Sequence, residues 1–229
     1  GTFEVLFSEP MNTGVTSVMT NLPGAAVSWN PSQSIFNITY TVLDEYTVYY
    51  VNFTGQGHTD TSGNALAGNM YFMFTTEDLT NPLAEAGSDE YRNAAFFTAS
   101  ASERIVPASA SDSGSGIANV TWTVEAGPGP ITWGSQWTLN TSVAASVAGM
   151  YILRITVTDG FGLVATDTFS LYWDLTPPVT SADTVSPYWQ TSSPLALTAP
   201  AADALSGMAS VELWYRFSAD NATWGAWTL

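Results

Sequence analysis

The sequence has no cysteine, no lysine and a single histidine among its 229 residues. Without cysteine the chain can form neither a disulfide nor a thiolate metal site, so packing alone would have to stabilise it outside the cell. Four arginines stand against twenty acidic residues, which gives a net charge of −16. Nucleic acids and anionic lipids are bound by clustered Lys and Arg, so this charge balance excludes both classes of partner. It favours a soluble, self-repelling surface with an affinity for divalent cations.

Long apolar runs are also missing. No run reaches the roughly 18 residues of a membrane-spanning helix, and no segment keeps the 3.6-residue period of an amphipathic helix. The chain does not begin with a secretory signal, so we expect a mature, internal or partial sequence. Aromatic residues are plentiful instead, with nine Trp, ten Tyr and eleven Phe, which is ample area for a packed core.

The sequence offers little for catalysis. His58 lies in a Gly-rich stretch, and no nucleophile motif such as G-x-S-x-G accompanies it. We therefore expect an exposed loop histidine. Paired acids such as Asp44-Glu45 are adjacent in sequence and are typical of solvated turns, whereas a glycosidase needs two carboxylates that face each other across a cleft. The sequence predicts that the chain is not an enzyme.

A motif that occurs twice organises the chain. Residues 112–120 and 203–211 share the pattern D-x-x-S-G-[IM]-A-x-V, lie 91 residues apart, and are each followed by W-G and W-T-L. A second motif, D-L-T-x-P, begins at Asp78 and again at Asp174. A repeat spacing near 95 residues is the length of one Ig-like sandwich and not of a solenoid repeat. We predict an all-β fold of three tandem Ig-like β-sandwich domains, over residues 1–77, 78–174 and 175–229.

Apolar residues that alternate with polar ones predict strands in each module. The segments 36–42, 151–157 and 164–173 show this pattern, as does 211–217, where we expect Leu213 to point inward and Trp214 to point to solvent. The second copy of the repeat ends at Leu229, the counterpart of Leu139, so we expect the last module to be incomplete. Either the sequence is part of a longer chain, or a neighbouring subunit donates the missing strands.

Three further motifs point to a known family. F-S-E-P-M at residues 7–11, D-T-S-G-N-A-L-A-G at 60–68 and F-M-F-T-T at 72–76 resemble, in this order, the bacterial Ig-like module of surface-layer proteins. The middle and last modules resemble PKD-type Ig-like repeats, through A-E-A-G at 84–87 and the G-M-Y-x-L-x-I-T-V-T-D-G-F-G run that begins at Gly149. These resemblances imply sandwich domains of a cell-surface or secreted protein that carry no catalytic residues.

Loop carboxylates are the candidates for a cofactor, which would be calcium. Ca²⁺ takes six to eight oxygen ligands from carboxylates, amides and carbonyls. Asp60 with Asn64 makes a compact oxygen-rich turn. Asp112 and Asp203 occupy equivalent places in the two copies, near Asp159 and next to linker acids such as Asp78 and Asp174. The alternative, which we favour from the sequence, is that these residues cap their own turns, because no spacing matches a dense calcium loop such as the EF-hand.

Surface residues supply two further predictions. N-x-S/T sequons predict glycosylation at Asn37, Asn52, Asn119, Asn140 and Asn221, although their number is little above chance. Tryptophans near loop ends predict contacts with other modules, subunits or sugars, and the candidates are Trp214, Trp224 and Trp227.

Together these features predict an extracellular structural or assembly protein, a tandem Ig-like segment of a cell-surface layer, sheath, filament or stalk. Its partners would be further copies of itself or neighbouring surface subunits, with glycans as a further possibility. One alternative is a non-catalytic, carbohydrate-binding accessory region of a secreted hydrolase. Another is a decoration module of a virion or tail fibre.

Overall fold

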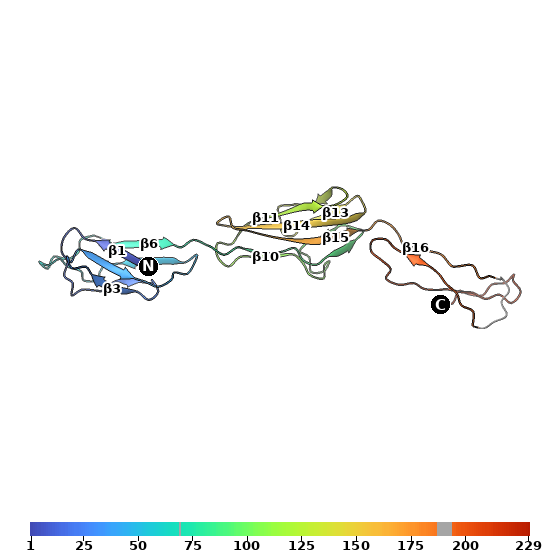
Figure 1. Ribbon diagram of the computed structural model, residues 1–229, viewed down its shortest axis with the longest axis horizontal. Coiled ribbons are helices and arrows are strands. Elements are labelled where there is room, and N and C mark those ends of the chain that lie inside the picture. Colours follow the sequence, from blue (N-terminus) through green and yellow to red (C-terminus); the bar gives the residue numbers. More distant parts are fainter. Residues whose placement is uncertain (69, 187–193) are drawn as a thin grey trace. The chain divides into compact units, whose positions relative to one another are not determined.

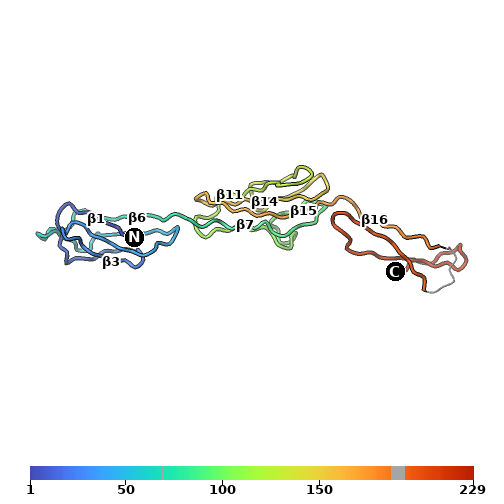
Figure 2. The backbone as a smooth tube through the Cα atoms, in the orientation of Figure 1, coloured from blue at the N-terminus to red at the C-terminus, as the bar shows by residue number. Residues whose placement is uncertain are grey.

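The computed structural model describes residues 1–68, 70–186 and 194–229, and strands are the only regular elements in that part of the chain. The all-β prediction is confirmed. The chain divides into two compact units, traced in Figures 1 and 2: unit 1 is Gly1–Pro82 with Ser111–Ala118 and Thr158–Ala165, and unit 2 is Leu83–Ala110, Asn119–Val157 and Thr166–Leu229. The boundaries of the three modules stay a prediction. Among the described residues no helix is long and apolar enough to cross a membrane.

Unit 1 contains two three-stranded antiparallel sheets (Figure 1). The first has the order β1-β4-β3, with β1 at Thr2–Leu6, β4 at Ile35–Thr39 and β3 at Ala26–Trp29. The second has the order β2-β5-β6, with β2 at Met19–Thr20, β5 at Val48–Asn52 and β6 at Tyr71–Thr75. The register sets Val5 opposite Phe36 in the first sheet and Val51 opposite Phe72 in the second.

The core of unit 1 joins residues from both sheets. Phe36 and Ile38 of β4 and Val51 of β5 are fully buried in one apolar cluster, which follows the alternation that the sequence shows. The ring of Phe36 meets those of Trp29 and Phe53 edge to face, with centroids 4.9 and 5.2 Å apart. Such aromatic contacts add roughly 0.5–1.5 kcal/mol each beyond the area that they bury.

His58 corrects one expectation, because it is only 3% exposed. Its ring lies 5.2 Å from that of Phe53 and 5.7 Å from that of Phe36. Its Nε2 lies 2.6 Å from the carbonyl oxygen of Ser17, and since a carbonyl only accepts, Nε2 donates this hydrogen bond. The glycines on either side predicted an exposed loop, but the segment folds inward and uses His58 as a core residue.

Unit 2 contains most of two further sheets (Figure 1), and the strand ends at residues 117–118, 158–159 and 164–165 belong to unit 1. The larger has the order β11-β14-β15-β8, with strands at Ile117–Ala126, Gly149–Asp159, Val164–Trp173 and Glu90–Arg92. The smaller has the order β12-β13-β9, at Ile131–Trp133, Ser142–Ala145 and Phe96–Phe97. Two short strands, β7 at Leu83–Glu85 and β10 at Ser109–Ser111, pair with each other.

The predicted strands of the middle module are confirmed. Along β14 the four apolar residues of the alternation are all fully buried, and they are Tyr151, Leu153, Ile155 and Val157. Trp122 of β11 is also fully buried, and its ring contacts those of Trp133 and Phe169, both at 6.1 Å. Because Trp133 lies in the smaller sheet and Phe169 in the larger one, this core lies between the two sheets.

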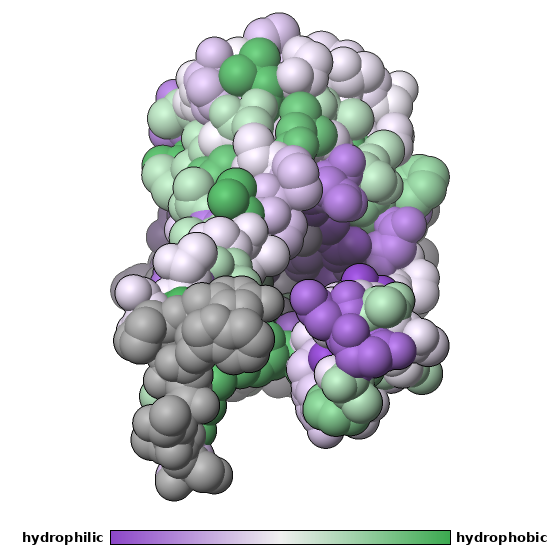
Figure 3. Space-filling model, turned by 90° about the vertical axis from the view of Figure 1, so that its right-hand side faces the viewer, coloured by the Kyte–Doolittle hydropathy of each residue, from purple (hydrophilic) through white to green (hydrophobic). Residues whose placement is uncertain are grey.

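The segment after Trp173 contains little regular structure among its described residues. β16 at Val179–Thr180 pairs with β17 at Ala201–Ala202, and an isolated bridge joins Tyr215 to Thr228. The strand predicted over 211–217 is not formed, and Leu213, expected to point inward, is 50% exposed. The face of the molecule in Figure 3 mixes apolar residues in green with hydrophilic ones in purple.

Candidate metal centre

Three aspartates bring their carboxylates together in unit 1. Asp78 follows β6, Asp112 follows β10, and Asp159 is the last residue of β14. One oxygen from each lies within 4.8 Å of the other two. Asp78 and Asp159 are each only 2% exposed, and Asp112 is partly buried. We call Asp78, Asp112 and Asp159 the three-aspartate cluster.

Two members of the cluster are held by their own turns. Asp112 Oδ2 accepts the backbone N–H groups of Gly114 and Gly116, at 3.0 and 2.7 Å. Asp159 Oδ1 accepts those of Phe161 and Leu163, both at 2.9 Å. This is the Asx arrangement, in which a short carboxylate side chain bonds to the backbone two and four residues further on. Each turn therefore fixes one oxygen of its aspartate and leaves the other oxygen free of the turn.

The remaining oxygens of these two aspartates are unusual. Asp112 Oδ1 and Asp159 Oδ2 are buried, and neither has a hydrogen-bond partner among the residues that the structure describes. Buried polar atoms are nearly always bonded in folded proteins, and an unbonded carboxylate oxygen is an especially unfavourable one to bury. These two atoms therefore call for a ligand that carries positive charge or donates hydrogen bonds.

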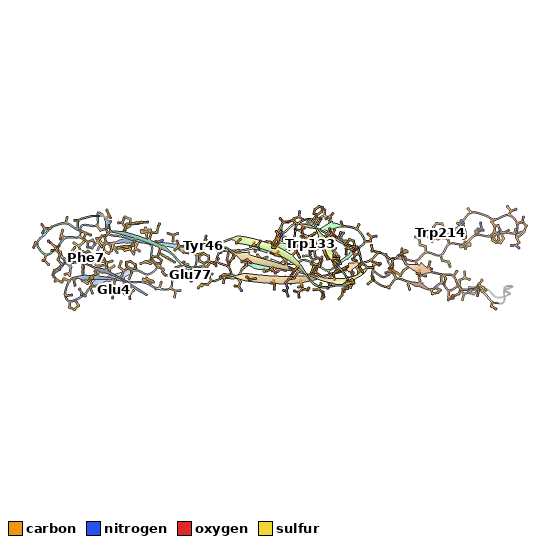
Figure 4. All side chains as sticks on the ribbon, turned by 90° about the horizontal axis from the view of Figure 1, so that it is seen from above. Glu4, Phe7, Tyr46, Glu77, Trp133 and Trp214 are labelled. Carbon is orange, nitrogen blue, oxygen red and sulfur yellow. The ribbon has the colours of Figure 1, made fainter. Side chains whose placement is uncertain are left out.

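Asp78 belongs to the D-L-T-x-P motif, and hydrogen bonds to Glu45 and Tyr46 hold this motif in place. The backbone N–H of Leu79 donates to Glu45 at 2.9 Å, and the hydroxyl of Thr80 donates to the same carboxylate. The N–H of Tyr46 donates to the carbonyl of Glu77 at 3.1 Å, and Figure 4 shows these two residues beside each other. Residues 77–80 are thus fastened to the segment that precedes β5.

The Asp78 carboxylate reaches across to the Asp112 turn. Its Oδ2 accepts the N–H of Ser115 at 2.7 Å, and its Oδ1 accepts the N–H of Thr80 at 3.2 Å. Hydrogen bonds from the Ser115 side chain and backbone, with that from Thr80, hold the pKa of the Asp78 carboxyl below its usual value against the opposing effect of burial. A Cβ at Gly114 would lie 2.4 Å from Asp78 Oδ2, so only glycine allows this approach.

No basic side chain of the protein neutralises the cluster. The sequence has no lysine, and its four arginines are engaged elsewhere: Arg92 and Arg104 pair with Glu90, Arg154 pairs with Glu125, and Arg216 lies over Trp224 and Trp227. Three carboxylates without sulfur or imidazole beside them are a ligand set for hard cations such as Ca²⁺ or Mg²⁺.

The second copy of the repeat builds the same turn in unit 2. Asp174 Oδ2 accepts the N–H of Ser206 at 3.2 Å and its hydroxyl at 2.6 Å, and Asp174 Oδ1 accepts the N–H of Thr176 at 2.9 Å. Asp203 Oδ1 accepts the N–H of Gly207 at 3.0 Å. Ser206 and Thr176 are the counterparts of Ser115 and Thr80. We call Asp174 and Asp203 the two-aspartate cluster, since no third acidic or histidine ligand joins it among the described residues.

The structure separates the residues that the sequence singled out for calcium. Asn64 donates to both oxygens of Asp60, from its backbone at 2.8 Å and its side chain at 2.7 Å, so this turn satisfies itself. Asp112 joins the three-aspartate cluster and Asp203 the two-aspartate cluster. Calcium binding at these residues stays a prediction.

Sequence reasoning did not select two members of the three-aspartate cluster as ligands. Asp78 opens the D-L-T-x-P motif, and Asp159 opens the Asp-Gly hairpin turn after β14. The sequence analysis placed both residues near Asp112, but it did not select them as ligands, and the structure brings their carboxylates together with that of Asp112.

The predicted glycosylation sites differ in accessibility. Asn119, Asn140 and Asn221 are exposed, whereas Asn37 and Asn52 are half-buried. Asn37 lies on the central strand β4, opposite Glu4 and Ser28. Glycosylation at all five positions stays a prediction, and exposure favours the first three sites.

The tryptophans predicted to make contacts are all accessible. Trp214, Trp224 and Trp227 are 49%, 47% and 59% exposed. The guanidinium of Arg216 lies 4.8 Å from the ring centre of Trp224 and 5.0 Å from that of Trp227, so it occupies one face of each. Trp214 and Trp227 line an open groove of about 430 Å³.

Comparison with known proteins gives one family match. Residues 1–76, about a third of the chain, match the family model described as a bacterial Ig-like domain. No curated protein sequence matches the chain.

Several solved structures show similarity at low identity. A PKD domain from the KIAA 1837 protein is 15% identical, with 44% of this chain and 96% of that chain covered and a TM-score of 0.32. Extracellular cadherin domains 3–6 of protocadherin gamma B2 are 12% identical, with 82% and 54% covered and a TM-score of 0.39. SGBP-B of the Bacteroides ovatus mixed-linkage glucan utilization locus, in complex with a mixed-linkage heptasaccharide, is 12% identical, with 85% and 48% covered and a TM-score of 0.19.

This chain thus spans about half the length of the two longer structures. At these identities and scores, neither their ligands nor their partners transfer to it. The family match carries more weight, since it agrees with the motifs and with the two-sheet core of unit 1. The chain contains tandem Ig-like β-sandwich modules, and residues 1–76 are similar to a bacterial Ig-like domain, a kind of module that is typically non-catalytic and extracellular.

Proposed function

We propose that this chain is a structural and assembly segment of an extracellular surface protein, such as a layer, sheath, filament or stalk. The observation that carries the proposal is the apolar surface of residues 208–229. Nine large apolar side chains there are between 38% and 73% exposed: Met208, Val211, Leu213, Trp214, Tyr215, Phe217, Trp224, Trp227 and Leu229. Contiguous exposed apolar patches on soluble proteins mark sites of contact with other proteins.

The first copy of the repeat indicates what would cover this surface. Trp122, the counterpart of Leu213, is fully buried because its strand β11 pairs with β14 and its ring packs on Phe169 of β15. Strands that add to an open sheet edge provide backbone hydrogen bonds and cover alternate side chains at once. We infer that strands equivalent to β14 and β15 cover residues 211–217 in the assembled protein.

A carbohydrate-binding role is the second candidate, because exposed aromatic rings can stack on sugars. Arg216 already occupies one face of Trp224 and of Trp227. Trp214 is 49% exposed and has no cation over its ring among the described residues, although its Nε1 donates to Glu212 at 3.0 Å. The arrangement therefore offers one ring for stacking, which favours assembly over sugar binding.

Light scattering and electron microscopy of the purified chain test the proposal. We expect concentration-dependent association that Leu213→Asp abolishes. Val42→Asp is the matched control, since Val42 is an exposed apolar residue of unit 1 that lies outside the surface in question. A chain that stays monomeric, or an equal effect of the two variants, would contradict assembly through residues 211–217. Saturable binding to a glycan array that Trp214→Ala removes would support the second candidate instead.

A further inference from the structure

We propose that Asp78, Asp112 and Asp159 form a calcium site that ties together three segments of unit 1. The site does not depend on the proposed function, since its geometry is independent of the surface at residues 208–229. Three features of the cluster carry the proposal: the free oxygens, the spacing of the carboxylates and the missing positive charge.

The free oxygens come first. Backbone N–H groups hold one oxygen of Asp112 and one of Asp159 in their turns. The other oxygens, Asp112 Oδ1 and Asp159 Oδ2, are buried without a partner, and the Asp159 side chain as a whole is almost completely buried. A turn-capping role explains the bonded oxygens and leaves these two unexplained. A cation would satisfy both of them at once.

The spacing fits one ion. Oxygens bound to calcium lie about 2.3–2.6 Å from it, so any two of them are at most about 5 Å apart. The three carboxylates offer oxygens that all lie within 4.8 Å of one another. Asp78 also accepts two backbone hydrogen bonds, but a carboxylate has about four lone-pair positions, so it can still coordinate.

The negative charge of the three carboxylates requires a cation, and their oxygen atoms determine which metal ions can bind. Three carboxylates meet where no Lys exists and where every Arg is engaged elsewhere. Carboxylate oxygens favour hard cations over zinc or copper. Among these, Ca²⁺ accepts a variable number of ligands in flexible geometry, whereas Mg²⁺ demands a near-ideal octahedron and gives up its water reluctantly. A site that three separate segments assemble, open to further carbonyls and water, suits calcium.

The ion would cross-link segments that are distant in sequence. Asp78 lies in the segment after β6, Asp112 opens the loop before β11, and Asp159 opens the turn between β14 and β15. Calcium would therefore stabilise unit 1 and protect residues 78–82 from proteolysis. Because the ion binds the folded state, its effect should grow with the logarithm of the free calcium concentration.

Calcium titration of the metal-free 229-residue chain tests the site, with calorimetry, thermal unfolding and limited proteolysis as readouts. We expect one strong calcium site, a melting temperature several degrees higher, and slower cleavage at residues 78–82. Asp159→Asn should weaken binding at least tenfold and remove both effects. Asn keeps an oxygen that accepts the two N–H groups of the turn, so the variant should fold in EDTA as the parent does. If Asp159→Asn does not fold in EDTA, Asp112→Asn provides the same test.

The matched control is Asp203→Asn, which makes the same change in the equivalent turn of unit 2. It should leave the strong site intact. The proposal is overturned if the parent chain binds no calcium, if Asp203→Asn weakens binding as much as Asp159→Asn does, or if Mg²⁺ binds as tightly as Ca²⁺.

Discussion

The two copies of the D-x-x-S-G motif share a turn and differ in what surrounds it. In both, an aspartate of a D-L-T-x-P motif accepts a hydrogen bond from the serine of the turn: Asp78 from Ser115, and Asp174 from Ser206. In the first copy a third carboxylate, that of Asp159, joins the site. Among the described residues the second site holds two aspartates, Asp174 and Asp203.

The difference extends to the core. Trp122 is fully buried in the first copy, whereas its counterpart Leu213 is 50% exposed. The turn needs only a few consecutive residues and one partner from the preceding motif, so both copies form it. The core needs strands β14 and β15, which follow Leu139 in the first copy. The local hydrogen-bonded turn therefore forms in both copies, whether or not strands cover the apolar residues that follow it.

Substitution of the two equivalent core residues should show the largest contrast. Trp122→Ala removes a buried ring that contacts Trp133 and Phe169 and should lower the free energy of unfolding by about 3–5 kcal/mol. Leu213→Ala removes a half-exposed side chain and should change it by about 0.5 kcal/mol or less. Urea denaturation followed by circular dichroism measures both. Comparable losses in the two variants would show that the second copy has a closed core of its own.

A smaller contrast should appear at the third residue of the turn. Gly114 leaves room for Asp78, and a Cβ there would lie 2.4 Å from its Oδ2, whereas the second copy has Leu205 at this position. Gly114→Ala should therefore destabilise the chain by about 1–3 kcal/mol through overpacking and weaken calcium binding.

Leu205→Ala is the matched variant in the second copy. The turn already accommodates a side chain there, so we expect a change of about 1 kcal/mol or less. Thermal unfolding in EDTA and in calcium separates the steric effect from the metal effect. If Gly114→Ala left the melting temperature unchanged in both conditions, the Asp78 carboxylate would not lie as close to residue 114 as the structure shows.

Alternation over short distances predicted the structure correctly in one copy of the repeat and not in the other. The alternation along 151–157 predicted a strand with one buried face, and β14 has that face. Alternation along 211–217 is as regular, but residues from other strands are needed to bury it. Period-two patterning thus identifies the side chains that can be buried, and only the presence of covering strands decides whether they are.

Long-range assembly limited the prediction of the candidate site. Asp78 and Asp159 are 81 residues apart, and although the sequence analysis placed both near Asp112, it could not show that their carboxylates meet at one point. Asp60 and Asn64 were predicted together because they are close in sequence, yet their oxygens and N–H groups satisfy one another. The burial of His58 was predicted wrongly for a related reason. The glycines around it indicate a flexible local backbone, but they do not show that the side chain packs in an aromatic cluster.

The smallest expected effect is a loss of stability at low pH that comes from Asp174 in the second copy. Hydrogen bonds from the Ser206 side chain, then from Thr176, hold the pKa of the Asp174 carboxyl well below its usual value. The unfolded chain therefore binds a proton at a higher pH than the folded chain does. The stabilisation is complete above the ordinary carboxyl pKa of about 4 and is lost as the pH falls below it toward the folded pKa.

Asp174→Asn should therefore flatten the decline in stability between about pH 5 and pH 2, measured in EDTA so that metal binding does not contribute. Ser206→Ala keeps the carboxylate but removes the hydroxyl that donates at 2.6 Å, so it should flatten the decline in part. If both variants follow the parent curve, the Ser206 bond is not maintained in solution. The turn of the second copy would then depend on the strands that cover it in the first, and the likeness between the two copies would be one of sequence alone.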